Sequence, residues 1–195
     1  MILRNSSSEY GAVTKALHWL TVLAITTQFV LGYAMESIAE GLLGQDDSGR
    51  GRGRGAESGR GRGGDGDADE ALVFAHAWVG LAIIVLAVVR LVWRRRTALP
   101  AWSDRLTTRD RRLESWLERG FYGLLFLIPS SGAALLFLSG EEREVGTEER
   151  WQPPLEVLSD DVLLVLHVAS HVTFFVVLVL HVGLVLRRRT LRRMV

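Results

Sequence analysis

The sequence contains no cysteine, and this absence removes several kinds of redox and structural chemistry. It excludes disulfides, iron–sulfur clusters, thiolate-ligated haem and covalent haem attachment through a C-x-x-C-H motif. Methionine is scarce as well, with three residues, Met1, Met35 and Met194. A metal bound within the apolar part of this chain would therefore depend mainly on histidine, of which there are five.

Four long apolar runs with few charged residues divide the sequence. Each spans roughly 19 to 25 residues, and a helix needs about 20 to cross the hydrocarbon core of a membrane. Leu, Val and Ala dominate the runs without strict alternation, which favours helices over the strands of a membrane barrel. We therefore predict an all-α integral membrane protein, a four-transmembrane-helix bundle formed by a single domain over residues 1–195. The predicted helices cover residues 14–35, 71–94, 118–139 and 161–187.

The basic residues are distributed unevenly along the chain. Most of the 23 Lys and Arg residues lie before the first run, between the second and third runs, or after the fourth. Since connections rich in Lys and Arg stay on the cytoplasmic side of a membrane, the pattern predicts both termini in the cytoplasm. We expect the first run to be retained as a helix, because Arg4 is the only base before residue 11 and no clean cleavage site follows the run.

The first connection is unusual because glycine and charges of both signs fill it. Residues 41–69 include the low-complexity stretch GRGRGRGAESGRGRGGDGDAD. Such a composition cannot bury enough apolar surface to fold, so we predict a disordered, solvated loop on the outer side of the membrane. RG-rich segments of other proteins bind RNA. Here carboxylates interrupt the arginines and the loop faces outward, so no nucleic-acid partner is expected.

Four histidines fall at two matching depths when they are counted from the helix ends. His76 and His167 each lie five residues after the start of an apolar run, so both are near the outer face. His18 lies about one turn into the first helix and His181 lies six residues before Arg187, so both are near the inner face. His167 and His181 share one face of a helix within about 40° and lie about 21 Å apart along it. The two pairs, His76–His167 and His18–His181, match the axial ligation of two b-type haem irons.

Other interpretations stay open from the residues alone. His171 lies one turn from His167 and could replace it as a ligand, or hydrogen-bond to a propionate, a quinone or a neighbouring helix. Gly80 lies one turn from His76 and would admit either a flat macrocycle or a closely packed helix. A zinc site prefers four clustered ligands, and a proton relay would use carboxylates within the membrane; the sequence shows neither pattern. Histidines that only hydrogen-bond between helices are a further alternative.

Several short stretches resemble the prokaryotic cytochrome b561 family over residues 14–194, apart from the glycine-rich loop. They are ALHWL in the first helix, FAHAWVG and VVRLVWR in the second, and TLRRM in the tail, together with the spacing of His167 and His181. The resemblance implies a multi-pass cytochrome of the bacterial inner membrane, with two haem b groups whose ligands fall on His18, His76, His167 and His181. The third helix departs from some relatives, which carry a histidine near its start, where this chain has Glu118 and Arg119.

The resemblance also implies electron transfer between an outer-side donor or acceptor and the membrane quinone pool, either ubiquinone or another quinone. Superoxide is one candidate donor, and the protein would then be an oxidoreductase. The alternative is a cytochrome b anchor subunit that relays electrons for a partner such as a hydrogenase or a formate dehydrogenase. A non-redox four-helix scaffold is the third hypothesis. The lipid bilayer is the partner that hydropathy itself predicts, and no pattern specifies an oligomeric state.

Overall fold

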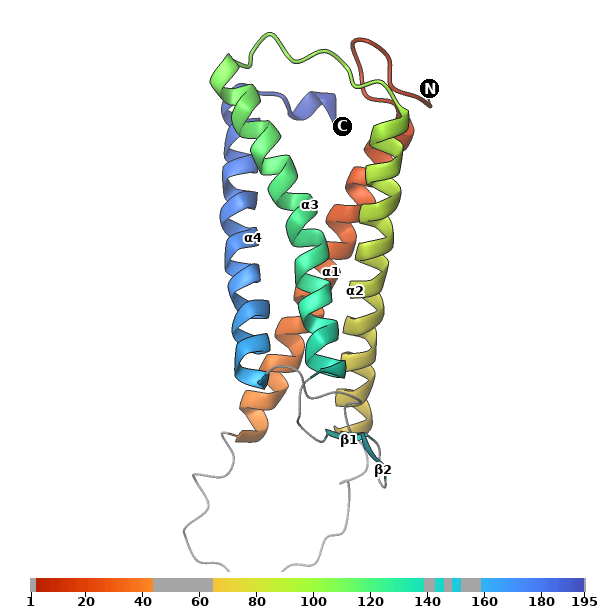
Figure 1. The fold of residues 1–195 in the computed structure, drawn as a ribbon, viewed down its shortest axis with the longest axis vertical. Coiled ribbons are helices and arrows are strands. Elements are labelled where there is room, and N and C mark those ends of the chain that lie inside the picture. Colours follow the sequence, from red (N-terminus) through yellow and green to blue (C-terminus); the bar gives the residue numbers. More distant parts are fainter. Residues whose placement is uncertain (1–2, 44–64, 139–142, 146–148, 152–158, 195) are drawn as a thin grey trace, which may run out of the picture.

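The computed structural model of the 195-residue chain describes residues 3–43, 65–138, 143–145, 149–151 and 159–194. Within these residues, four long helices run along the longest axis: α1 Ala12–Leu43, α2 Asp65–Arg96, α3 Thr108–Phe137 and α4 Asp160–Arg188 (Figure 1). A short 3₁₀ helix, η1 Leu191–Arg193, follows α4. Two three-residue strands, β1 Arg143–Val145 and β2 Glu149–Trp151, pair antiparallel.

Each of the four long helices contains a segment that is long and apolar enough to cross a membrane. The segments are Ala12–Met35, Ala71–Arg96, Thr108–Phe137 and Asp161–Arg188. This confirms the predicted all-α, four-helix membrane bundle. The β1–β2 hairpin, in the connection between α3 and α4, is a small addition that the sequence analysis did not anticipate.

Many apolar side chains of the bundle point away from it. Val165 and Val179 on α4 are 66% and 69% exposed, whereas a small buried apolar cluster consists of Ile83, Ala87 and Leu125. Exposing apolar surface to water costs roughly 25 cal/mol per Å². A surface of this kind is therefore suited to hydrocarbon, and the lipid bilayer takes the place of an outer protein layer.

Helix α3 begins well before the expected start near residue 118. The Thr107 hydroxyl accepts a hydrogen bond from the Asp110 backbone N–H at 3.3 Å, and Asp110 Oδ2 accepts one from the Thr107 backbone N–H at 2.8 Å. This reciprocal capping box satisfies two backbone donors at the helix start. The polar residues before the apolar run therefore form the first turns of α3 rather than a separate turn.

The predicted disordered loop over residues 41–69 overlaps the described chain only at its two ends. Helix α1 continues to Leu43, and helix α2 begins at Asp65. The intervening residues 44–64 lie outside the described residues, so the prediction of disorder remains a prediction there.

The helices pack as two pairs joined by a central contact. Helix α1 packs along α2, α3 packs along α4, and α2 contacts α3. At this central contact, Gly80 is buried, and a Cβ atom built on it would lie 3.4 Å from Gln28 of α1 and 3.8 Å from Pro129 of α3. Of the two roles considered for Gly80, the structure shows close helix packing.

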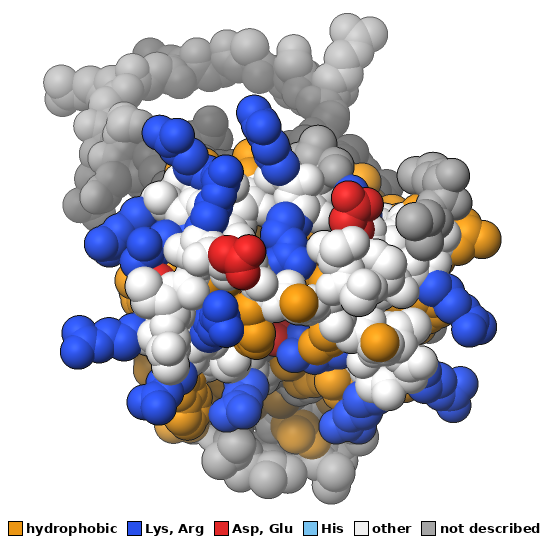
Figure 2. Space-filling model, turned by 90° about the horizontal axis from the view of Figure 1, so that it is seen from above, with side chains coloured by type: hydrophobic (Ala, Val, Ile, Leu, Met, Phe, Trp, Pro, Cys, Tyr) orange, Lys and Arg blue, Asp and Glu red, His pale blue; other side chains and the backbone are white. Residues whose placement is uncertain are grey.

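Both chain termini lie at one end of the bundle (Figure 1). The Trp19 indole N–H donates to the Met194 carbonyl at 2.9 Å, and Arg193 donates to the Ala101 carbonyl at 2.7 Å. These bonds tie the C-terminal tail to α1 and to the connection between α2 and α3. Lys and Arg side chains crowd this end, as seen from above in Figure 2.

Candidate functional site

The five histidines lie half-buried inside the bundle and form two groups along its axis. His76 of α2 lies near His167 of α4, and the ring centres of His167 and His171 are 4.4 Å apart. His18 of α1 and His181 of α4 lie near each other, closer to the end that carries the termini. The structure therefore brings together the residues that were paired by depth, and it adds His171 to the outer group.

The outer histidine of α4 is held by hydrogen bonds to α3. His167 Nδ1 lies 2.9 Å from the Ser131 hydroxyl oxygen and 3.1 Å from the Ile128 carbonyl oxygen. The Ser131 hydroxyl itself donates to the Ile128 carbonyl at 2.8 Å. Since a carbonyl only accepts, the proton of the neutral imidazole belongs on Nδ1. In this tautomer the lone pair of His167 is on Nε2, which is then the nitrogen that can bind a metal.

Each outer imidazole also lies against a glycine of the paired helix. A Cβ atom on Gly32 of α1 would be 3.3 Å from His76 Cε1, and one on Gly132 of α3 would be 3.1 Å from His167 Cε1. Both distances are shorter than ordinary van der Waals contact, so any larger residue would push the ring. The two glycines let the helices approach the histidines closely and limit the orientations of the rings.

Two buried polar atoms near the outer group lack a hydrogen bond. Gln28 Oε1 has no hydrogen-bond partner within the described part of the chain, and the His76 ring approaches the Gln28 backbone without a hydrogen bond of standard geometry at Nδ1. An unpaired buried polar group costs about 1–3 kcal/mol. Such groups in a membrane bundle point to a functional site rather than to a structural contact.

The inner group is arranged differently, because a cation touches one of its histidines. Arg90 Nη2 lies 3.2 Å from His18 Nδ1. A guanidinium only donates, so Nδ1 accepts in this arrangement and the ring proton belongs on Nε2. Ligation of a metal through Nε2 of His18 would therefore require this contact to open.

Aromatic rings connect the outer and inner groups without a break. The His167 and His171 ring centres are 4.4 Å apart, and the Phe121 ring centre lies 5.4 Å from that of His181. Between them, Phe29 and the buried Phe174 are 5.6 Å apart. Two further ring contacts complete this row: the ring centres of His171 and Phe29 are 5.2 Å apart, and those of Phe174 and Phe121 are 5.6 Å apart. A packed apolar layer therefore separates the two histidine groups and keeps water out of the space between them.

The arrangement of the His, Asp and Glu side chains is relevant to the interpretation of the histidines as a zinc site. Among the described residues, no three or more His, Asp or Glu side chains are arranged to hold one metal ion. A structural zinc site has four such ligands around one centre. The histidines instead come in two separate groups, as axial ligands of planar cofactors would.

Sequence reasoning missed the residues that position the histidines. Ser131, Gln28 and the two glycines Gly32 and Gly132 contact or adjoin the outer group, but none of them was singled out. A signal was present: Gln28 and the pair Ser130–Ser131 are among the few polar residues of their apolar runs. Their partners on other helices can be identified only once the bundle is assembled.

Comparison with known proteins gives one clear match. The family model described as prokaryotic cytochrome b561 matches residues 9–195, nearly the whole chain. No curated protein matches the chain.

Proposed function

Since the chain belongs to the prokaryotic cytochrome b561 family, a family of membrane proteins that bind haem b, we propose that it is a transmembrane di-haem cytochrome. In this proposal, it transfers electrons between an outer-side donor or acceptor and the membrane quinone pool. It lies in the bacterial inner membrane with both termini in the cytoplasm. The observation that carries the proposal is the arrangement of the histidines in two groups, one toward each end of a four-helix membrane bundle.

The residues of the outer group fit a haem. His167 Nδ1 is directed at the Ile128 carbonyl, which leaves the lone pair on Nε2, and the His76 ring approaches the Gln28 backbone. Glycines lie where a larger side chain would crowd both rings. We assign His76 and His167 as the axial ligands of the outer haem iron. His171, whose ring touches that of His167, is assigned to the surroundings of this haem.

The inner pair, His18 and His181, would ligate the second haem. Here Arg90 must leave His18 Nδ1, and its freed guanidinium could then pair with a carboxylate such as a haem propionate. The bound haems would supply one-electron chemistry, while the chain holds the imidazoles and excludes water between the sites. The packed rings of Phe29, Phe174 and Phe121 would exclude water between the two sites.

Superoxide is one donor to test. Two superoxide anions would each lose one electron to give dioxygen, and one quinone would take up both electrons with two protons to give the quinol. The acidic connection after α3 argues against strong electrostatic steering of an anion to that side. Superoxide therefore stands as one candidate among small outer-side reductants.

Alanine variants of the proposed ligands test the assignments. We expect His76→Ala and His167→Ala to lose the outer haem, and His18→Ala and His181→Ala to lose the inner one. His171→Ala is the matched control, because it removes a histidine from the same helix and should keep both haems. Haem per polypeptide and the absorption spectrum of each purified variant give the answer. Loss of the outer haem in His171→Ala, with both haems retained in His167→Ala, would reverse the outer assignment.

Quinone turnover tests the second half of the proposal. The purified chain, reduced with dithionite and freed of excess reductant, should be reoxidised by a soluble ubiquinone analogue. A protein with two haems that no quinone analogue reoxidises would contradict the quinone link. Copurification of a stoichiometric redox partner would instead favour the anchor-subunit function.

A further inference from the structure

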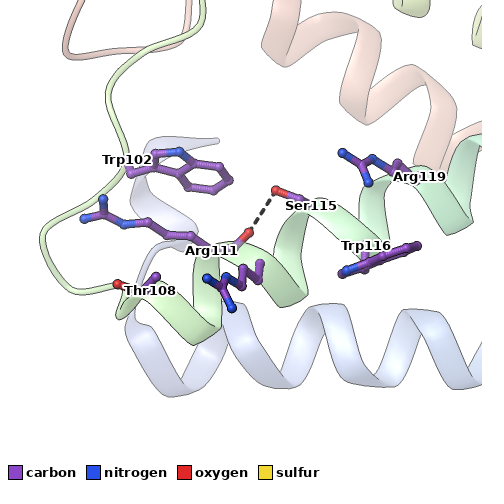
Figure 3. Close-up of a pocket in the computed structure, with 7 residues that line it drawn as sticks. Trp102, Thr108, Arg111, Ser115, Trp116 and Arg119 are labelled. Carbon is purple, nitrogen blue, oxygen red and sulfur yellow. Dashed lines mark hydrogen bonds between the residues drawn. The ribbon is translucent and has the colours of Figure 1, made fainter.

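An open pocket of about 310 Å³ lies beside the first turns of α3, at the arginine-rich end of the molecule (Figure 3). Cationic and aromatic side chains dominate its wall. The residues that matter here are Trp102, Arg111, Arg112, Ser115, Trp116 and Arg119. None of the five histidines lines it, so the pocket is separate from the proposed haem sites.

The α3 residues of the pocket form one stripe along the helix. Arg111, Ser115 and Arg119 follow one another at intervals of four residues, which places them on the same face. The Arg119 guanidinium carbon lies 5.3 Å from the centre of the Trp116 ring. In Figure 3, the Arg111 side chain runs beside Trp102, which comes from the connection between α2 and α3. The pocket thus combines a row of cations with two flat aromatic surfaces.

The positive charge of the pocket is not neutralised by the neighbouring carboxylates. Asp110 accepts from Arg188 of α4 at 2.7 Å, and Glu118 pairs with Arg94 of α2. Among the described residues that line the pocket, none is a carboxylate. In addition, Arg111 Nε is buried and has no hydrogen-bond partner within the residues that the structure describes. An anionic group rich in acceptor oxygens would satisfy this donor and balance the charge.

The position of the pocket relative to the membrane follows from the apolar part of α3. Residues 120–137 carry no charge and would span about 27 Å, close to the thickness of the hydrocarbon core. Arg119 therefore lies at the border of the hydrocarbon. Arg111 lies about 12 Å further along the helix, at or just beyond the level of the lipid headgroups. Tryptophan is also enriched at this level of membrane proteins.

We propose that this pocket binds the headgroup of an anionic phospholipid such as phosphatidylglycerol. Arginine binds phosphate oxygens with two parallel hydrogen bonds, and three arginines favour a lipid with net negative charge over a zwitterionic one. In this proposal, Trp116, in contact with Arg119 near the border of the hydrocarbon, packs against the glycerol region, and Trp102, beside Arg111, packs against the headgroup. The site anchors the start of α3 to the inner leaflet, and it does not depend on haem binding.

A lipid titration of the full-length purified chain tests this. Native mass spectrometry in detergent measures binding of phosphatidylglycerol and of phosphatidylcholine. Replacing Arg111, Arg112 and Arg119 with Gln should weaken phosphatidylglycerol binding on the order of 100-fold, since each of the three basic residues contributes about 1 kcal/mol near an anionic lipid surface. The control replaces Arg95, Arg96 and Arg109 with Gln, which removes the same charge at the same end but outside the pocket, and should change binding little.

Several outcomes would overturn the proposal. They are equal losses in the two triple variants, no loss in either, or equal affinity for phosphatidylcholine and phosphatidylglycerol. Competition by inorganic phosphate at the same concentration as the lipid would also overturn it, because the site would then recognise free phosphate.

A second variant keeps the test decisive if the triple variant does not fold. Ser115→Asp places a carboxylate in the pocket without removing an arginine, and it should reduce phosphatidylglycerol binding to a similar degree. Ser103→Asp adds the same charge to the neighbouring connection and serves as its control. Unchanged binding by Ser115→Asp would contradict the proposal.

Discussion

At the scale of single residues, the Ser131 hydroxyl is the side-chain contact that helps to orient the proposed ligand His167. It lies 2.9 Å from His167 Nδ1 and donates to the same carbonyl that His167 approaches. We expect Ser131→Ala to weaken haem retention at the outer site about tenfold, as loss of a partner of a metal-ligating histidine typically does. It should also shift the reduction potential of that haem alone. Haem titration and redox potentiometry measure both effects, and Ser130→Ala, at an exposed neighbour, is the control. An identical response of the two variants would show that Ser131 has only a structural role.

Gly132 supports a second residue-scale prediction, because it limits the space for the same ring. In Gly132→Ala the new Cβ would lie 3.1 Å from His167 Cε1, so the imidazole must shift. We expect an altered low-spin haem signal in the electron paramagnetic resonance spectrum and partial loss of the outer haem. Gly123→Ala on the same helix is the matched control, since a Cβ there meets nothing within 4 Å. Unchanged spectra in Gly132→Ala would show that the contact does not restrict the ligand.

At the scale of the elements, the start of α3 depends on its capping box. Thr107→Ala removes the hydroxyl that accepts from the Asp110 backbone. We expect a loss of about 1 kcal/mol in local stability, the usual cost of removing such a cap. Hydrogen exchange of the first turn of α3 should become faster, whereas Thr108→Ala, one residue further on, should leave it nearly unchanged. Equal exchange rates in both variants would contradict a stabilising role for the cap.

Hydropathy predicted the existence of the four helices but not all of their ends. The apolar runs specify which residues cross the membrane, because the thickness of the hydrocarbon core sets a minimum length. The first turns of α3 are charged, so hydropathy could not include them, and their helical state depends on Thr107 and Asp110. The depth of His76 and His167 could be counted from the helix ends. The contacts of Ser131 and Gly132 with His167 could not be predicted from the sequence, because they depend on which face of α3 packs against α4.

At the scale of the whole molecule, both termini and the arginine-rich connection share one end, which we expect to face the cytoplasm. The absence of cysteine allows a clean test with single-cysteine variants. Ser159→Cys, at the exposed start of α4, should react with a membrane-impermeant maleimide in intact cells. Ser7→Cys, exposed at the opposite end, should react only after lysis. The reverse labelling pattern would invert the orientation and exchange the inner and outer histidine groups.

The central claim is that the whole bundle holds two haems, one at each histidine group. The most direct test is a dithionite-reduced minus oxidised absorption spectrum of the purified chain, with haem quantified per polypeptide. We expect two low-spin b-type haems per chain. One haem would contradict one of the two pairs, and the absence of haem from the folded protein would contradict the electron-transfer function itself.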